Sequence, residues 1–371
     1  MKTIRILQCG LTESYGGMEA FILEVYRNLD RTKIQFDFLI THNGKIACEE
    51  EIKSLGGRIF RIEYSRKENF VKHYTELENF FKIHASEFCA VHMNSCFPKY
   101  SLPLKYAKKY GIKTRIFHSH NSGDMYASNS KIKTFFKNIE YKIERYFIKK
   151  RANVKLACSN EAGRYVFGKS DFKVINNGID INKFKFDCKL REKVRNELKF
   201  KYDDKVVGFV GRLQYQKNPL FALKVFNELQ KQDSKYKMII IGVGNLKEKM
   251  EKYIQENKIE GVFFLGQRKD VNELYQAMDY FLFPSVFEGL GIALIEAETS
   301  GVRCFASTAV PELTNITDNV RFLELEKGEK EWARIISNTD IVSRNDSYKN
   351  VKKNKFDIRD TVGELVGVYN K

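Results

Sequence analysis

The stretch FPSVFEGLGIALIEA, residues 283–297, leads from the end of an apolar strand pattern through a glycine loop into a helical pattern. The rest of the chain can be interpreted from this stretch. The apolar run from Tyr280 to Phe283 predicts a buried strand, which ends at a Pro-Ser pair. A loop with two glycines follows, and a helix is predicted to begin near Gly291. Because the first turn of a helix presents unpaired backbone N–H groups and the positive end of the helix dipole, this loop favours an anionic ligand.

Two glutamates frame the same loop. Glu288 lies within it, and Glu296 falls about one and a half turns into the predicted helix. Carboxylates repel a bare phosphate, but they accept hydrogen bonds from hydroxyl groups. We therefore expect a ligand that carries both phosphate and many hydroxyls, such as a sugar nucleotide. The alternative is an ordinary strand, loop and helix with surface glutamates.

Glu288 and Glu296, with seven residues between them and preceded by the Pro-Ser pair, lie in a pattern that resembles the signature of the family 4 retaining glycosyltransferases, which have the GT-B fold. The resemblance implies that Glu288 faces the donor sugar and that Glu296 holds the ribose hydroxyls. It also implies that the loop of Gly289, Leu290 and Gly291 touches the donor diphosphate.

The length of 371 residues is enough for two domains of ordinary size. No apolar run approaches the roughly 20 residues of a spanning helix, and the amino terminus enters a strand without the pattern of a signal peptide. The seven cysteines are scattered without a CxxC pair, which fits a reducing compartment. The expected location is the cytoplasm, including the inner face of the cell membrane.

The formal net charge of +17 indicates an anionic partner, which can be a nucleic acid, a nucleotide or a membrane surface. Part of this charge reflects a lysine-rich surface, since lysines alternate with glutamates in segments such as residues 247–252. The basic residues show none of the aromatic interleaving of a recognised nucleic-acid module, so no nucleic-acid partner is expected.

Apolar runs with the character of strands recur along the whole chain and alternate with helical patterns. This alternation predicts parallel sheets built from βαβ units. The expected strands are Ile4–Cys9, Phe36–Ile40, Arg58–Ile62, Ala90–Met93, Thr114–Phe117, Val154–Ala157, Lys173–Ile175, Val206–Val210, Met238–Ile241, Val262–Leu265, Tyr280–Phe283, Cys304–Ala306 and Arg321–Leu323.

The strand pattern restarts at Val206 after a charged, loop-like passage. The expected fold is therefore α/β, with two Rossmann-like, doubly wound halves facing each other across a cleft, the GT-B arrangement that the resemblance implies. We predict an acceptor-binding domain over residues 1–180 and a donor-binding domain over residues 181–355. A carboxyl-terminal helix within residues 356–371 is expected to cross back to the first domain.

Gly16 and Gly17 stand where the first strand has ended and a helix begins. Neither the GxGxxG dinucleotide fingerprint nor the GxxxxGK[ST] phosphate loop fits this turn, which argues against a dinucleotide oxidoreductase. The resemblance implies that the two glycines let the backbone approach the donor diphosphate. The alternative is a flexible turn.

His118 and His120 lie at the end of the strand that begins at Thr114, where an α/β fold places its ligands. The resemblance implies that His120 lies beside the donor sugar, although Asn121 stands where many relatives have Asp. Both histidines share one face of the strand, so the choice between them stays open. A solvated loop histidine is the alternative.

Arg212 and Lys217 occupy the loop between a strand that ends at Gly211 and a helix that starts near Pro219. Two cations at this edge would neutralise a diphosphate and stabilise the charge that develops as it leaves. The segment resembles the diphosphate-binding loop of the family. Arg268, after a glycine and a glutamine, resembles the loop that holds the nucleotide base.

His84, Cys89, His92 and Cys96 have the residue types of a zinc site. The alternation of a strand would send Cys89 and His92 to opposite faces, so we predict no metal site. The resemblance also implies a metal-independent enzyme without a cofactor.

Residues 131–151 form a basic amphipathic pattern. Two interpretations stay open: the apolar stripe packs onto the first domain, which we favour, or the helix lies on an anionic membrane. The stripe consists of Ile132, Phe135, Phe136, Ile139, Ile143, Tyr146 and Phe147, and the basic residues are Lys131, Lys133, Lys137, Lys142, Arg145, Lys149, Lys150 and Arg151.

The chain is thus predicted to be a retaining glycosyltransferase similar to bacterial enzymes of capsular or exopolysaccharide assembly. It would move a hexose or N-acetylhexosamine from a nucleotide-diphosphate sugar, with UDP as the expected nucleotide, to a hydroxyl of a lipid-linked saccharide. The alternatives are a GT-B sugar-nucleotide epimerase, a phosphorylase, or a transferase acting on a soluble acceptor. The donor sugar and the linkage stay open.

Overall fold

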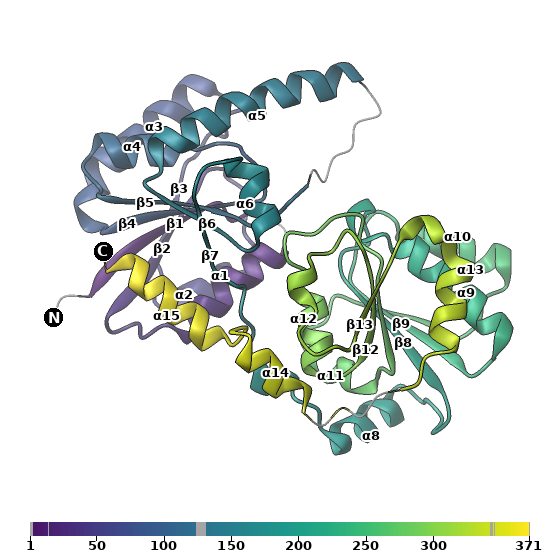
Figure 1. Ribbon diagram of the computed structural model, residues 1–371. Coiled ribbons are helices and arrows are strands. Elements are labelled where there is room, and N and C mark those ends of the chain that lie inside the picture. Colours follow the sequence, from purple (N-terminus) through teal and green to yellow (C-terminus); the bar gives the residue numbers. More distant parts are fainter. Residues whose placement is uncertain (1–2, 14, 124–130, 342–343, 345, 371) are drawn as a thin grey trace. The chain divides into compact units, whose positions relative to one another are not determined.

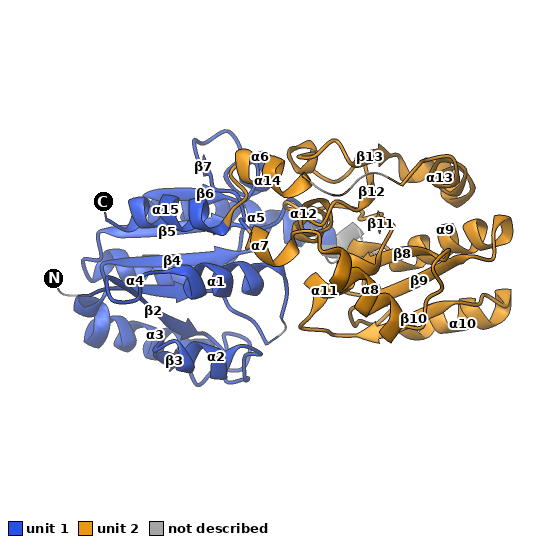
Figure 2. Ribbon diagram, turned by 90° about the horizontal axis from the view of Figure 1, so that it is seen from below, with its two compact units in different colours: residues 1–178, 358–371 blue, residues 179–357 orange. Residues whose placement is uncertain are grey.

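The computed structural model describes residues 3–13, 15–123, 131–341, 344 and 346–370, and of residues 131–133 it describes the backbone alone. The chain forms two compact units (Figures 1 and 2). Unit 1 comprises residues 1–178 and 358–371, and unit 2 comprises residues 179–357.

The sheet of unit 1 has seven strands in the order β3-β2-β1-β4-β5-β6-β7, and every pairing in it is parallel. The strand order reverses between β1 and β4, so this sheet has its topological switch point there. The strands are β1 (Ile4–Cys9), β2 (Ile34–Ile40), β3 (Ile59–Arg61), β4 (Ala90–Ser95), β5 (Thr114–Ser119), β6 (Val154–Ala157) and β7 (Lys173–Val174).

Helices cover both faces of this sheet (Figure 1). Residues of α1, α2 and α15 share one apolar core with β1 and β2 on one face, while α3, α4 and α5 lie on the other. The carboxyl-terminal helix α15 therefore completes the core of unit 1. The helices are α1 (Gly17–Asn28), α2 (Glu49–Ser54), α3 (Phe70–His84), α4 (Leu102–Lys109), α5 (Lys131–Arg151), α6 (Asn160–Phe167) and α15 (Ile358–Tyr369).

The sheet of unit 2 has six strands in the order β10-β9-β8-β11-β12-β13, again with parallel pairings throughout. Its order reverses between β8 and β11. The strands are β8 (Lys205–Val210), β9 (Tyr236–Ile241), β10 (Val262–Gly266), β11 (Tyr280–Phe283), β12 (Arg303–Ser307) and β13 (Val320–Leu323).

The sheet of unit 2 is apolar on both faces, as expected for a sheet covered by helices on both sides. Ile239 and Ile240 belong to two different core clusters because successive side chains of a strand point to opposite faces. The helices are α7 (Ile181–Phe184), α8 (Cys188–Glu197), α9 (Pro219–Gln232), α10 (Lys247–Asn257), α11 (Val271–Ala277), α12 (Ile292–Thr299), α13 (Gly328–Ser337) and α14 (Ser347–Lys353).

The predicted pair of doubly wound α/β halves is confirmed, and each of the thirteen expected strands is present. Strand β3 is shorter at both ends than the predicted Arg58–Ile62. It is an edge strand of its sheet, so it has a hydrogen-bonding neighbour on one side only.

The favoured interpretation of the stripe on residues 131–151 is wrong. Helix α5 packs through its other side, on which Tyr141 and Ile148 are buried. The stripe residues Phe135, Phe136, Ile139, Ile143 and Tyr146 are instead 39–66% exposed. The side chains of Lys131, Ile132 and Lys133 lie outside the described residues.

None of the described helices is both long enough and apolar enough to cross a membrane.

Candidate active site

Unit 2 gathers most of the predicted site residues at the carboxyl edge of its sheet. β8 leads into Gly211 and Arg212, and its neighbour β11 leads into the loop that starts at Pro284. In open α/β sheets, ligands bind beside the carboxyl ends of the strands at which the order reverses. The predicted donor loops thus flank the switch point of this sheet.

Glycines bring the loops after β8 and β9 into backbone contact. A Cβ atom on Gly242 would lie 2.0 Å from the Gly211 carbonyl oxygen, and Gly242 has a φ of +136°. A Cβ atom on Gly244 would lie 2.3 Å from the Leu213 carbonyl oxygen. Since only glycine fits such close approaches, the Gly-x-Gly turn fixes the position of the Arg212 loop.

Lys217 and Glu288 form an ion pair at this edge. The Lys217 Nζ lies 2.6 Å from Glu288 Oε1, and the side chains are only 16% and 6% exposed, respectively. The same ammonium lies 4.7 Å from the centre of the Phe283 ring, at the end of β11. The sequence pattern predicted both residues as ligand-binding groups but gave no sign that they pair with each other.

Gln216 ties the two loops together. Its backbone carbonyl accepts a hydrogen bond from the Val286 N–H at 2.8 Å, and its side-chain Nε2 donates to the Phe287 carbonyl at 3.2 Å. Its Oε1 lies 3.5 Å from a guanidinium nitrogen of Arg212. No sequence pattern marks this residue, because a buried glutamine inside a polar loop has no periodic signal.

The loop residue Gly291 has a φ of +95° and directly precedes α12, whose first turn offers backbone N–H groups. Leu290, beside it, is buried. Glu296, in the second turn of α12, accepts a hydrogen bond from the Tyr275 hydroxyl at 3.0 Å. Burial, followed by the charge of Glu296, raises the pKa of Tyr275 well above its ordinary value, so the tyrosine stays a neutral donor.

Arg268 is not drawn into this cluster. Its guanidinium makes an ion pair with Asp270 two residues further on, and both side chains are more than one-third exposed. Its predicted role at the nucleotide base therefore stays a prediction.

Gly16 and Gly17 occupy the amino terminus of α1 in unit 1. The Gly16 N–H donates to Glu19 Oε2 at 3.0 Å, and the other oxygen of that carboxylate accepts from the Thr12 hydroxyl at 2.8 Å. Glu19 thus closes the loop onto the first turn of the helix. This local role of Glu19 was not recognised in the sequence.

His118 and His120 lie side by side at the end of β5, with ring centroids 4.2 Å apart. His118 is completely buried, whereas His120 retains 9% exposure. The alternative of a solvated loop histidine is therefore wrong for both. Burial lowers the pKa of His120 to about 3 and lowers the pKa of His118 as well, so both rings are neutral.

The residues with the spacing of a zinc site lie in different environments. His84 hydrogen-bonds Glu87 at 2.6 Å, Cys89 is exposed, and His92 is buried next to His118. Among the described residues, the structure brings no three His, Cys, Asp or Glu side chains together as a metal site.

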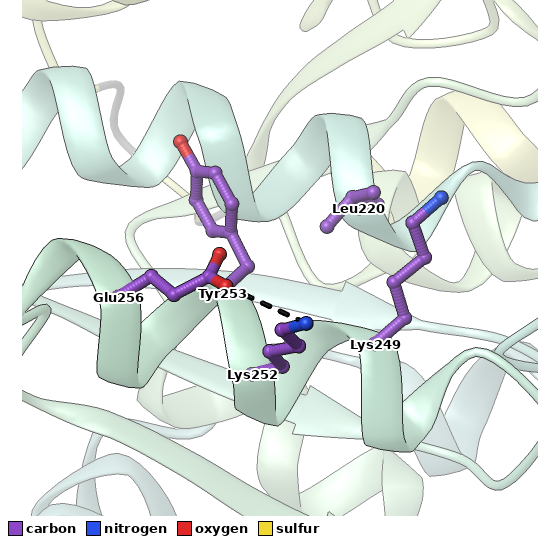
Figure 3. Close-up of a pocket in the computed structure, with 5 residues that line it drawn as sticks. All are labelled: Leu220, Lys249, Lys252, Tyr253 and Glu256. Atoms are coloured by element: carbon purple, nitrogen blue, oxygen red, sulfur yellow. Dashed lines mark ion pairs between the residues drawn. The ribbon is translucent and has the colours of Figure 1, made fainter.

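A shallow hollow of about 300 Å³ lies on the surface of unit 2 between α9 and α10 (Figure 3). It is lined by Leu220, Lys249, Lys252, Tyr253 and Glu256, and the Lys252 ammonium pairs with the Glu256 carboxylate at 3.7 Å. None of the predicted site residues lines it, so we do not regard it as the donor site.

The fold defines the class of protein. The crystal structure of HepE from Anabaena in complex with UDP and glucose superimposes with a TM-score of 0.77 over 99% of each chain, at 18% sequence identity. The chain therefore has the GT-B fold, as the sequence predicted.

The sequence comparisons give the family. The model described as Glycosyltransferase Family 4 matches residues 15–183, and the model described as Glycosyl transferases group 1 matches residues 191–355. EpsF of Bacillus subtilis, which is named as a glycosyltransferase, is 30% identical over 365 residues that cover 96% of this chain and 93% of EpsF. The chain belongs to the family 4 glycosyltransferases, and it is an enzyme of that kind.

Two further relatives have more specific names. The capsular polysaccharide biosynthesis glycosyltransferase CapH of Staphylococcus aureus is 25% identical over 99% of this chain and 98% of CapH. A UDP-galactose:α-D-GlcNAc-diphosphoundecaprenol α-1,3-galactosyltransferase of Escherichia coli is 34% identical over 145 residues, or 36% of each chain. The relatives thus include enzymes that act on lipid-linked sugars.

Proposed function

We propose that this enzyme transfers a hexose or N-acetylhexosamine from a UDP-sugar to a hydroxyl of a lipid-linked saccharide, with retention of the anomeric configuration, in the assembly of a polysaccharide. The observation that carries the proposal is the buried pair of Lys217 and Glu288 at the switch point of the unit 2 sheet, with Arg212 on the same loop as the lysine. Cations suit the diphosphate, and carboxylates suit the hydroxyls.

In the proposed reaction, the bond between the anomeric carbon and the diphosphate oxygen breaks. The acceptor oxygen forms a bond on the same face of that carbon, and its proton passes to the departing diphosphate. Arg212, Lys217 and the first turn of α12 stabilise the negative charge on the diphosphate. Because Lys217 and Glu288 are buried together, the donor replaces each partner: phosphate for the lysine, and sugar hydroxyls for the glutamate.

The remaining roles follow the family resemblance. Glu296 accepts hydrogen bonds from the ribose, with Tyr275 holding the carboxylate in place. His120 faces the donor sugar, and Gly16 and Gly17 allow close approach of the diphosphate. We propose that the transfer needs no metal ion, and we expect a chelator such as EDTA to leave its rate unchanged.

The donor and acceptor are inferred from the relatives. HepE was crystallised with UDP and glucose, and the Escherichia coli enzyme is named for a UDP-sugar and a diphosphoundecaprenol acceptor. We therefore infer UDP as the nucleotide and a lipid-linked saccharide as the acceptor. A sugar-nucleotide epimerase, a phosphorylase and a transferase for a soluble acceptor are the alternatives.

The test is donor-induced thermal stabilisation across UDP-, GDP- and ADP-sugars, followed by transfer to undecaprenyl-diphosphate-linked acceptors. We expect UDP-sugars to stabilise the wild type and to give little stabilisation of Lys217→Ala or Glu296→Ala. Lys249→Ala, which removes an exposed lysine of the α9–α10 hollow, is the matched control and should respond like the wild type. A flat response to every nucleotide would overturn the proposal, and release of UDP without any acceptor would favour the epimerase.

We further propose that α5 docks on an anionic membrane, which would bring the enzyme to a lipid-linked acceptor. The exposed apolar stripe of α5 is flanked by the exposed side chains of Lys142, Lys149 and Lys150. The Lys150 ammonium lies 4.4 Å from the centre of the Tyr146 ring. Apolar side chains entering the interface, together with about 1 kcal/mol per lysine near anionic lipid, suit such a surface.

The membrane proposal is tested by co-sedimentation with vesicles of phosphatidylglycerol or of phosphatidylcholine. We expect binding to phosphatidylglycerol alone, weakened by salt and lost in Phe135→Ser/Phe136→Ser. The control is Phe70→Ser/Val71→Ser, which removes two exposed apolar side chains of α3 that are 55% and 71% exposed. Equal loss of binding in both double variants would overturn the assignment to α5.

A further inference from the structure

A buried polar network surrounds His120 in unit 1. Each member is at least nine-tenths buried, and each forms a hydrogen bond with another member. The members are Gln8 on β1, His92 and Asn94 on β4, His118 on β5, His120 directly after β5, and Tyr369 on α15.

The side-chain amide of Asn94 is held in one orientation. Its nitrogen lies 3.4 Å from the backbone carbonyl oxygens of Cys9 and His92, which only accept hydrogen bonds, and 2.9 Å from Gln8 Oε1. Its oxygen therefore faces His120 Nε2, at 3.0 Å. Because an amide oxygen can only accept, His120 Nε2 carries the proton and Nδ1 carries the lone pair.

The orientation of the Asn94 amide also fixes the hydrogen-bond directions from Gln8 through Tyr369 to the other two histidines. Gln8 Oε1 accepts from Asn94, so Gln8 Nε2 donates to the Tyr369 hydroxyl at 3.4 Å. The hydroxyl hydrogen then goes to His92 Nδ1 at 2.8 Å, and His92 Nε2 donates to His118 Nδ1 at 3.2 Å. Every imidazole thus has a single N–H, and the directions agree throughout the network.

The surroundings of His120 keep it neutral. His118 adjoins it on the same strand, His92 lies on β4 and Tyr369 on α15, while α1 contributes the Phe21 ring at 5.2 Å between centroids. Burial lowers the pKa of each of the three histidines, and burial raises the pKa of the Cys9 thiol on β1, so none of these groups is charged at neutral pH. Among the described residues, His120 Nδ1 has no hydrogen-bond partner.

We propose that Asn94 is a positioning residue that holds His120 as the neutral Nε2–H tautomer. His120 Nδ1 can then accept a hydrogen bond from a ligand hydroxyl but cannot donate one. The inference rests on the proposed function only where it identifies that hydroxyl as belonging to the donor sugar. An aspartate at position 94 would place a negative charge beside Nε2 and favour the imidazolium.

The test is long-range proton–nitrogen NMR of the full chain with ¹⁵N-labelled histidine, with the His120 signals assigned by their loss in His120→Gln. We expect the wild type to show the proton on Nε2 between about pH 5 and pH 8, without titration in that range. In Asn94→Asp, His120 should titrate within the range, and the transfer rate should fall about tenfold per pH unit below the new pKa. Asn227→Asp, which introduces an aspartate at a buried position of α9 in unit 2, is the matched control and should leave His120 unchanged.

A proton on Nδ1 in the wild type would overturn the inference, and so would an unchanged His120 signal in Asn94→Asp. If Asn94→Asp does not fold, the wild-type tautomer alone decides. The NMR result does not depend on activity. If the tautomer is as expected but His120→Gln keeps full donor affinity and rate, the positioning by Asn94 stands and the role of His120 in the proposed function fails.

Discussion

Lys217 and Glu288, which we propose bind the donor, form a buried ion pair. Burying a charge is costly, and in the structure the two opposite charges compensate each other. Gln216 holds the backbones of the two loops together at the same point. The ion pair and the glutamine therefore hold the two loops together, which would preorganise them for the proposed donor.

Removing only one member of this pair should be more harmful to stability than removing both. We expect Lys217→Met to lower the free energy of unfolding by about 3–5 kcal/mol, because the buried Glu288 carboxylate loses the lysine charge beside it, and Lys217→Met/Glu288→Leu to lower it less. Both variants should lose transfer activity by about 100-fold or more. Denaturant unfolding and initial rates measure the two effects separately. Equal stability of the single variant and the wild type would show that the ion pair is not formed in solution.

Glu298 is a buried residue whose protonation makes the stability of the folded enzyme depend on pH. One carboxylate oxygen accepts hydrogen bonds from the Ile316 N–H, the Thr317 N–H and the Thr317 hydroxyl, at 2.8–3.0 Å. Burial raises the pKa of Glu298 to about 8, although these hydrogen bonds oppose the shift. The folded chain therefore keeps a proton that the unfolded chain has released at neutral pH.

Because the pKa of Glu298 is higher in the folded state, its contribution to stability is full below the unfolded pKa and is lost as the pH rises to about 8. The buried histidines act below pH 6.5, where stability falls as the pH falls, so above pH 6.5 the Glu298 effect is measured without theirs. We expect the melting temperature of the wild type to fall by several degrees between about pH 6.5 and pH 8.5. Glu298→Gln should fall less, and a parallel decrease in both proteins would contradict the assignment.

At the scale of elements, the contact between the loops after β8 and β9 depends on glycine. Gly242→Ala would place a Cβ atom 2.0 Å from the Gly211 carbonyl oxygen, at a φ of +136°. We expect a loss of stability of more than about 1–3 kcal/mol and a loss of donor binding, because the Arg212 loop must move. Gly328→Ala is the matched control: its φ is +76°, but its Cβ atom would meet no atom within 4 Å. Unfolding curves and UDP titrations of the two variants check this, and equal losses would contradict the role of the loop contact.

The elements themselves were predictable from the sequence, while several of their contacts were not. Period-2 and period-3.6 patterns of apolar residues report which side of an element is buried, and they located all thirteen strands along the chain. For α5 the apolar pattern failed, because a pattern shows that a stripe is apolar without showing whether protein covers it. Tyr141 and Ile148 supply a second apolar side, and that side is the one that packs.

The residues of the candidate site that lie in sequence motifs could be predicted, and those outside motifs could not. Arg212, Lys217 and Glu288 were predicted from loops at strand ends, and Glu296 from the helix that follows one of these loops, all of which follow from βαβ topology. The network of Gln8, Asn94 and Tyr369 was missed because its members are far apart in the sequence, and no motif marks them. Hydrogen-bond partners across a sheet depend on strand order, which a single sequence does not give.

At the scale of the whole molecule, the two units carry different parts of the proposed reaction. In that proposal, unit 2 contributes Arg212, Lys217, Glu288 and Glu296, whereas unit 1 contributes Gly16, Gly17, His120 and the exposed stripe of α5. The carboxyl-terminal helix α15 is part of unit 1, since Tyr369 hydrogen-bonds His92 and Gln8. Truncation before α15 would therefore disturb the histidine network as well as the apolar core.

The most direct measurement is proton NMR of the reaction with the UDP-sugar that stabilises the enzyme and an undecaprenyl-diphosphate-linked acceptor. We expect UDP to appear only with the acceptor, the product to carry the sugar in the anomeric configuration of the donor, and Lys217→Ala to prevent both. A product of inverted configuration would contradict the proposed chemistry. Equal UDP release with and without acceptor would contradict the assignment as a transferase to lipid-linked sugars.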